Sequence, residues 1–230
     1  GERDGEWKWL YAHTGTIDES ITYKDGSLNG KHRTYREDGS LKTEAEFIDG
    51  KYSGHYYYFS RYGDTLSDVM LKDGVRNGEY LSYYPNGILK EQAFFKEGDL
   101  DSTNTTYYPN GNIQTTASYT ENDLNGEFTT YYFNGKIKTK GIYVDDELNG
   151  EYTTYFQNGN IESIGQYKEH SAVGSWKYYF YNGSLEKEIE YDKKGKINAT
   201  LKAYDRDGNH YKTEEYKNFT SESKFFKEKN

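Results

Sequence analysis

The stretch NGEFTTYYFNGKIKTKGIYVDDELNGEYTTYFQNGNI, residues 125–161, contains nearly the same motif twice. Asn149-Gly150-Glu151-Tyr152 repeats Asn125-Gly126-Glu127-Phe128 after 24 residues, and the residues that follow keep the same order of types. A fixed period of about 20–50 residues is typical of repeat arrays, in which each unit is one supersecondary structure that stacks on its neighbours. The period therefore decides the fold class before any single residue does.

The same period runs through most of the chain. The glycine of the Asn158-Gly159 dipeptide recurs in steps of 24 residues, and a last step of 25 reaches Gly208. These anchor glycines are Gly15, Gly39, Gly63, Gly87, Gly111, Gly135, Gly159 and Gly183. A second glycine precedes the first strand of most units, and Ser102 replaces it in one. We predict one repeat array over residues 1–208, followed at residues 209–230 by a further strand and a short cap or tail, with a capping helix at 221–227 as one alternative.

Each unit has the sequence pattern of a β-hairpin. A run of β-branched and aromatic residues, such as 152–156, precedes the anchor glycine, and a run that alternates with period two follows it. Asn-Gly between two such runs predicts a two-residue type I′ turn, whereas residues 145–149 predict a longer polar loop at the other end. The predicted fold is all-β: an elongated single-layer antiparallel β-meander of about eight 24-residue hairpin repeats.

The alternation separates two faces of the predicted sheet. At even offsets from the anchor glycine the residues are aliphatic, small or aromatic, as at Ile161, Gly165 and Tyr167, whereas odd offsets carry charge, as at Lys138 and Lys140. Even and odd positions of a strand point to opposite faces. The sheet is therefore expected to have one apolar face and one charged face.

A row of aromatic residues interrupts the charged face. It falls five positions after the second glycine, or its replacement Ser102, and we call it the aromatic ladder. Its members are Tyr35, Phe59, Tyr83, Tyr107, Tyr131, Tyr155 and Tyr179. Tyrosine offers a large contact area at a small entropy cost, so the ladder is our candidate binding surface for a peptide, a helix or a sugar chain. Packing of these rings against neighbouring Lys and Glu stems is the alternative, and the pattern alone leaves both open.

The composition excludes several kinds of partner. The chain of 230 residues has a net charge of −9 and no cysteine. Nucleic-acid backbones and anionic membranes attract clustered Lys and Arg, so we expect no nucleic-acid partner. No apolar run approaches the ~20 residues of a membrane span, so we expect no direct membrane insertion. The chain opens at Gly1 without an initiator Met, and both a cytoplasmic protein and one exported with a leader missing here remain open.

No cluster of residues points to catalysis, a cofactor or a resident metal. The five histidines occupy unrelated repeat positions, and no zinc-protease, nucleophile-elbow or phosphate-loop motif occurs. Residues 145–150 have the sequence pattern of the first half of an EF-hand loop. The last ligand position of such a loop would fall on Phe156, whereas an EF-hand has Glu there. We predict a protein that is not an enzyme, with no catalytic residues, no metal site and no cofactor, and weak calcium binding at the acidic loop stays open.

Three short sequence segments resemble the MORN repeat: Asn149-Gly150-Glu151-Tyr152, Tyr108-Pro109-Asn110-Gly111 and residues 143–150. The resemblance covers residues 3–192, and the YYPNG form is similar to the bacterial MORN variant of the YwqK antitoxin type. It implies a scaffold or binding role, and the antitoxin type implies a toxin partner. The phospholipid binding proposed for the family would imply basic patches, and this acidic chain departs from that.

The functional prediction is a non-enzymatic protein-binding scaffold that uses an extended aromatic sheet face, with an antitoxin-like role as its narrower form. The expected partner is a protein or peptide. A cell-surface or periplasmic carbohydrate-binding module and a structural assembly module are the two alternatives. The sequence does not identify the partner, the compartment or the oligomeric state.

Overall fold

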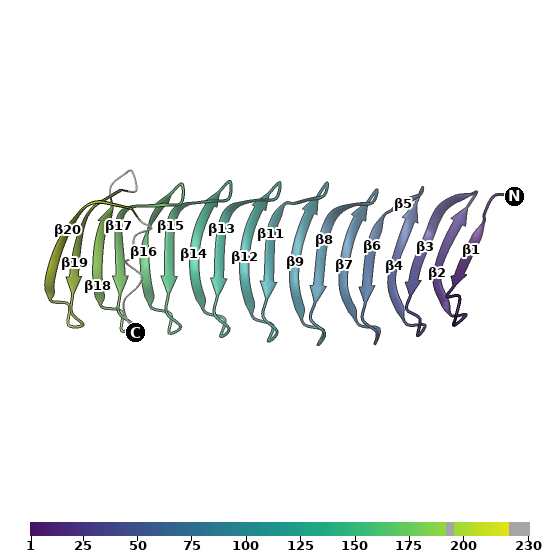
Figure 1. Cartoon of the computed structure of the whole chain (residues 1–230), viewed down its shortest axis with the longest axis horizontal. Helices are drawn as coiled ribbons and strands as arrows, with labels where there is room; N and C mark the ends of the chain where they lie inside the picture. Colours follow the sequence, from purple (N-terminus) through teal and green to yellow (C-terminus); the bar gives the residue numbers. More distant parts are fainter. Residues whose placement is uncertain (192–195, 221–230) are drawn as a thin grey trace. The chain divides into compact units, whose positions relative to one another are not determined.

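The computed structural model describes the backbone of residues 1–191 and 196–220 and the side chains of residues 1–191 and 201–215 (Figure 1). The described backbone forms twenty β-strands, and it contains no helix that could cross a membrane. The predicted capping helix at 221–227 lies outside the described residues. The chain divides into two compact units, and each is described by itself.

The first unit comprises residues 1–113 and 119–122. Its strands are β1 (Gly5–Leu10), β2 (Ile17–Lys24), β3 (Ser27–Tyr35), β4 (Leu41–Ile48), β5 (Lys51–Tyr52), β6 (Gly54–Phe59), β7 (Thr65–Lys72), β8 (Val75–Tyr83), β9 (Leu89–Lys96), β10 (Asp99–Leu100) and β11 (Ser102–Tyr107). The long strands pair antiparallel in chain order. The short strands β5 and β10 extend β6 and β11, because β5 and β6 both pair with β4, and β10 and β11 both pair with β9.

The second unit comprises residues 114–118 and 123–230, and β12 (Ile113–Thr120) contributes residues to both units. Its other strands are β13 (Asp123–Tyr131), β14 (Ile137–Val144), β15 (Glu147–Tyr155), β16 (Ile161–Lys168), β17 (Ser171–Tyr179), β18 (Leu185–Tyr191), β19 (Lys196–Tyr204) and β20 (His210–Thr220). From β13 onward each strand pairs antiparallel with the next. The predicted all-β antiparallel meander of 24-residue hairpins is confirmed within each unit, and β20 is the predicted further strand.

The turns at the anchor glycines have a different geometry from the predicted one. Gly87 N–H donates to the carbonyl of Tyr84 at 2.9 Å, and Tyr84 N–H donates to the carbonyl of Ile88 at 2.8 Å. The loop thus has three residues, of which Gly87 alone has positive φ, at 79°. This is a type I turn followed by a glycine bulge. The type I′ prediction was wrong, because that turn requires positive φ at Asn86 as well, and Asn86 instead uses its Oδ1 to accept the Ile88 N–H.

The type I′ turns lie at the opposite ends of the strands. Asp145 and Asp146, with φ of 49° and 65°, form a two-residue connection between β14 and β15. Positive φ at both positions is the requirement of a type I′ turn. The predicted longer polar loop over residues 145–149 was therefore wrong, since β15 already begins at Glu147.

The second glycine of the repeat marks a bulge inside a strand. Gly141 pairs with Tyr152 and Tyr143 with Leu148, so that residues 149–151 lie opposite the single residue Ile142. Gly150 takes a φ of 120° there. Ser102 occupies the equivalent position with a φ of 98°, a conformation that disfavours any residue with a side chain.

The two faces of the sheet differ as the alternation predicts. On the apolar face the buried hydrophobic side chains are small, aliphatic or aromatic; they include Ala45, Phe47, Ala93, Leu148, Ala172, Trp176 and Ile189. No large side chain among the described residues is fully buried, so packing is shallow. The charged face carries cross-strand pairs such as Arg33–Glu44, His55–Asp68 and Lys177–Glu188.

Candidate functional site

Every member of the aromatic ladder is the last residue of its strand. Tyr35, Phe59, Tyr83 and Tyr107 end β3, β6, β8 and β11, and Tyr131, Tyr155 and Tyr179 end β13, β15 and β17. All seven side chains are half-buried. Each ring therefore stands beside an anchor turn, at the same point of successive repeats within a unit.

Carboxylates lie near the ladder residue Tyr83 and near Tyr57, the neighbour of the ladder residue Phe59. Burial raises the pKa of Tyr83, and the nearby carboxylates of Asp68 and Glu79 raise it further. The ring of Phe59 lies 6.0 Å from that of Tyr57, measured between centroids. Burial raises the pKa of Tyr57 as well, and Asp68 adds to the shift. These contacts set Phe59 and Tyr83 among the acidic groups of the charged face.

A side-chain hydrogen bond from the preceding repeat holds the backbone of several ladder residues. The phenol of Tyr11 donates to the carbonyl of Tyr35 at 2.8 Å, and the phenol of Tyr132 donates to the carbonyl of Tyr155 at 2.6 Å. The guanidinium of Arg36 takes this role toward Phe59. The sequence prediction missed these donors. The available signal was the residue three positions before the anchor glycine, which is Tyr132 before Gly135 and Arg36 before Gly39, whereas Tyr11 stands four positions before Gly15.

Many polar side chains of the charged face form hydrogen bonds with one another. Glu44 accepts from Arg33 Nε at 2.6 Å and from Lys31 Nζ at 3.2 Å. Glu79 accepts from the amide of Gln92 at 2.6 Å. The polar side chains around the ladder thus have defined partners and positions before any ligand arrives.

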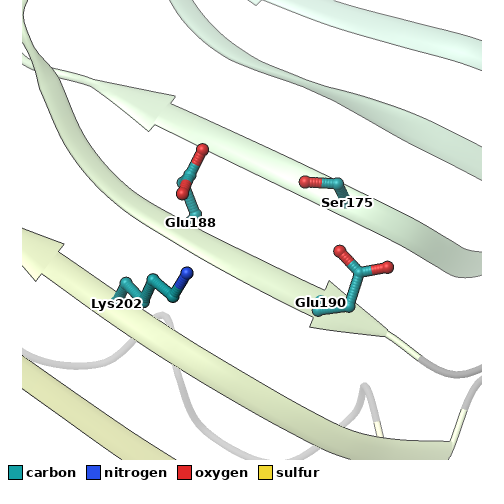
Figure 2. Close-up of a pocket in the computed structure, with 4 residues that line it drawn as sticks. All are labelled: Ser175, Glu188, Glu190 and Lys202. Atoms are coloured by element: carbon teal, nitrogen blue, oxygen red, sulfur yellow. The ribbon is translucent and has the colours of Figure 1, made fainter.

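A hollow of 280 Å³ lies on the charged face of the second unit, lined by Ser175, Glu188, Glu190 and Lys202 (Figure 2). Glu188 lies 3.7 Å from the ammonium of Lys177 and accepts from the phenol of Tyr204 at 3.3 Å. The hollow is thus a polar depression between strands, and its best-placed carboxylate already has two partners.

The acidic loop that resembles an EF-hand start uses its carboxylates inside the fold. Asp146 accepts the N–H of Leu124 at 2.8 Å, and Asp145 accepts from the amide of Asn125 at 3.2 Å. Among the side chains of residues 1–191 and 201–215, no three His, Cys, Asp or Glu are placed to hold a metal ion.

The histidines have separate local partners. His32 lies 2.8 Å from Glu19 and 2.7 Å from the phenol of Tyr52, and His55 lies 2.8 Å from Asp68. His170 accepts the N–H of Leu148. His13 contacts Glu37 and His210 contacts Thr213, so in the described part of the chain each histidine contacts groups of its own surroundings.

The period, the hairpins and the turn glycines together match one family model, the MORN repeat variant, in six segments. They are residues 28–49, 76–97, 100–121, 124–145, 148–169 and 172–193. The chain belongs to the MORN repeat variant family. The matched segments keep the 24-residue step, and β5, β6 and β7 supply a further hairpin in the unmatched interval between the first two.

No curated protein matches this MORN repeat protein. Among solved structures, a chain of "Crystal Structure of TcdB2-TccC3-Cdc42" is 10% identical, over 86% of this chain and 14% of that chain, with a TM-score of 0.19. The chain thus spans a small part of that structure's length, and a likeness at this score carries no argument about fold or function.

Proposed function

We propose that this MORN repeat protein is a non-enzymatic scaffold that binds a protein or peptide through the aromatic ladder. The observation that carries the proposal is the recurrence of a half-buried aromatic ring at the same strand end in seven repeats. Aromatic side chains on a polar surface are enriched in protein interfaces, because they combine contact area with little conformational freedom.

Preorganisation supports the same proposal. The hydrogen bonds from Tyr11, Tyr84 and Tyr132 fix the carbonyls of the ladder residues Tyr35, Tyr107 and Tyr155. A surface that is ordered before binding loses less entropy when a partner arrives. The ladder is therefore better suited to binding than a row of rings on a mobile backbone would be.

The charge of the chain indicates the chemistry of the partner. The net charge is −9, and Asp68 and Glu79 act on the ladder residue Tyr83. Complementary charge speeds encounter and disfavours wrong partners, so the partner is expected to present a basic surface with apolar side chains. In the narrower antitoxin-like form of the proposal, suggested by the YYPNG resemblance, that partner is a toxin.

The test compares the wild type with two ladder variants by affinity capture from a lysate and mass spectrometry. One variant carries Tyr83→Ser and Tyr107→Ser, and the other carries Tyr131→Ser and Tyr155→Ser. Each removes two rings within one unit, and circular dichroism verifies that the sheet is retained. A protein that the wild type captures and a folded ladder variant loses would support the scaffold and locate its surface.

A matched control removes aromatic rings that lie off the ladder. Tyr62 and Tyr181 are turn residues with 91% and 59% of their surface exposed. Their Tyr→Ser double variant is expected to keep the partner. If both ladder variants remain folded and retain every captured protein, the ladder is not the binding surface, and glycan-array and light-scattering experiments then test the carbohydrate and assembly alternatives.

A further inference from the structure

A second hollow, of 270 Å³, lies on the apolar face of the second unit. Four rings and one carboxylate line it: those of Tyr152, Tyr167, Trp176, Tyr178 and Glu162. The volume is just below the ~300 Å³ at which pockets for drug-sized ligands begin, so it fits a small group instead of a whole large ligand.

This hollow occurs where the repeat departs from its own pattern. At the position of Tyr178, the repeats before it in the second unit carry Thr130 and Thr154. At the position of Glu162, the preceding repeat carries the opposite charge, Lys138. The first unit also carries a tyrosine at this position, Tyr58, but Lys42 stands there in place of Glu162, so the combination of Tyr178 with an acidic residue is what sets this repeat apart.

The rings surround the hollow in several orientations. Tyr167 meets Trp176 edge-on with centroids 4.9 Å apart, and it meets Tyr152 edge-on at 5.6 Å. Tyr178 is stacked beside Trp176 at 6.2 Å. Gly165 allows this arrangement, because a Cβ atom there would lie 2.1 Å from the Trp176 ring. The Trp176 indole also donates to the carbonyl of Gln166 at 3.1 Å, which fixes the ring.

The bulge of β16 brings a negative charge to these rings. Thr154 pairs with Ser163 and Tyr155 with Ile161, so Glu162 has no partner in the register and lines the hollow. A bulge commonly re-aims a side chain in this way. Glu162 is the one charged residue among those that line the hollow.

The surrounding rings already accept ammonium groups. Lys187 Nζ lies 4.6 Å from the ring centroid of Tyr178, and Lys138 Nζ lies 5.9 Å from that of Tyr132. The field of Glu162 also reaches Tyr132, whose pKa is raised first by burial and then by this carboxylate. The rings of this face therefore contact ammonium groups, and Glu162 places one carboxylate beside them.

We infer that this hollow binds a methylated ammonium group, held by the rings of Tyr152, Tyr167, Trp176 and Tyr178 and by the carboxylate of Glu162. Aromatic cages with an acidic residue recognise quaternary ammonium ions through cation–π attraction. A metal ion is a poorer fit, because one carboxylate is too few ligands. A sugar is a poorer fit as well, because Tyr167 meets both Trp176 and Tyr152 edge-on, so these rings form no flat stacking platform.

Trp176 supplies the signal for the test. In a Trp7→Phe, Trp9→Phe background it is the one tryptophan of the chain, because the sequence contains three. Choline chloride is titrated against its neutral carbon isostere, dimethylbutanol, with sodium chloride holding the ionic strength constant. Choline is expected to change Trp176 emission in a saturable manner, and dimethylbutanol to bind about tenfold more weakly. A trimethyllysine peptide and its unmodified counterpart show whether a side chain can supply the group.

Two variants test the assignment of the cage. Glu162→Gln is expected to weaken choline binding about five- to tenfold while leaving the effect of dimethylbutanol unchanged. Tyr178→Thr restores the residue of Thr130 and Thr154 and is expected to abolish saturation. The matched control is Tyr58→Thr in the first unit, which makes the same exchange at the same repeat position, and it is expected to bind choline as the wild type does.

Three results would overturn the inference: no saturable response to choline, equal binding of choline and dimethylbutanol, or unchanged choline binding in Glu162→Gln. The Glu162→Gln variant decides the matter if Tyr178→Thr does not fold, because an exposed Glu to Gln exchange leaves the sheet intact. The site lies apart from the aromatic ladder, so its outcome is independent of the proposed scaffold function.

Discussion

The phenol of Tyr84 donates a hydrogen bond to the backbone carbonyl of Tyr107, 2.7 Å away. Tyr84 begins the anchor turn of one repeat, and Tyr107 is the ladder residue of the next. Tyr132 and Tyr155 form the same contact in the second unit. One side chain thus ties consecutive repeats together at the level of the ladder, in addition to the hydrogen bonds between strands.

Removal of one such hydroxyl is expected to weaken the array. Tyr132→Phe leaves the ring in place and deprives the Tyr155 carbonyl of its donor, which should lower the free energy of unfolding by about 1 kcal/mol. Urea unfolding followed by circular dichroism measures the change. The reciprocal variant is Phe156→Tyr, since Phe156 holds the same repeat position without a hydroxyl. That variant should gain stability, and equal midpoints for Tyr132→Phe and wild type would contradict the role of the bond.

Ser102→Gly is expected to stabilise the first unit. Ser102 has a φ of 98° at a position where the repeat otherwise uses glycine, and a backbone strained in this way costs about 1–3 kcal/mol. Glycine removes the strain but adds entropy to the unfolded chain, so we expect a net gain of about 1 kcal/mol. The matched control is Gly150→Ser, where φ is 120° and an added Cβ would meet its nearest atom at 3.5 Å. This control should lose stability through its backbone conformation alone. A destabilised Ser102→Gly would show that the serine side chain stabilises the unit by more than its strained backbone costs.

The two turn types respond to opposite substitutions. Asn86 precedes the positive-φ residue of a type I turn with a glycine bulge, so Asn86→Gly should lower stability by about 0.5–1 kcal/mol through unfolded-state entropy and the loss of the bond to Ile88. Glu97 has a φ of 53° in a type I′ turn, so Glu97→Asn should raise stability by a few tenths of a kcal/mol, because Asn tolerates this region better. Thermal unfolding of both variants checks the pair. A stabilised Asn86→Gly would indicate a type I′ turn at the anchor after all.

The sequence predicted the period, the hairpins and the polarity of the two faces, but it inverted the turn types. Asn-Gly fits either a two-residue type I′ turn or the last two residues of a three-residue loop, and the choice depends on which residues pair across the hairpin. The pairing of Tyr83 with Leu89 settles that register, and it is a property of two strands together. Asp145-Asp146 gave a weaker signal, because acidic residues at positive φ are less common than glycine or asparagine.

The ring cluster around Trp176 could not be predicted from the sequence either, because it too depends on how two strands pair. In a chain with 18% aromatic residues, one more tyrosine at position 178 is inconspicuous, whereas Ser102 stood out because it replaced a glycine. Glu162 belongs by parity to the charged face, and the bulge between Thr154 and Tyr155 brings it to the other side. Parity rules hold only while the register has no bulge.

Alkaline pH is expected to destabilise the second unit through its buried phenols. Burial raises the pKa of Tyr178, Tyr167 and Tyr191, whereas an unfolded tyrosine titrates near pH ~10. Because the folded state holds these protons more tightly, their contribution to stability is fully present below about pH 10 and declines as the pH rises above it, when the unfolded chain ionises first. Urea midpoints measured from about pH 8 to about pH 11 should therefore fall over the upper part of that range, with phenolate absorbance appearing together with unfolding.

The variant Tyr178→Thr tests this assignment. It removes one of the phenols whose pKa is raised, so its urea midpoints should fall less steeply with pH. Identical slopes for this variant and the wild type would mean that Tyr178 ionises equally well in the folded sheet, which is incompatible with its burial against Trp176.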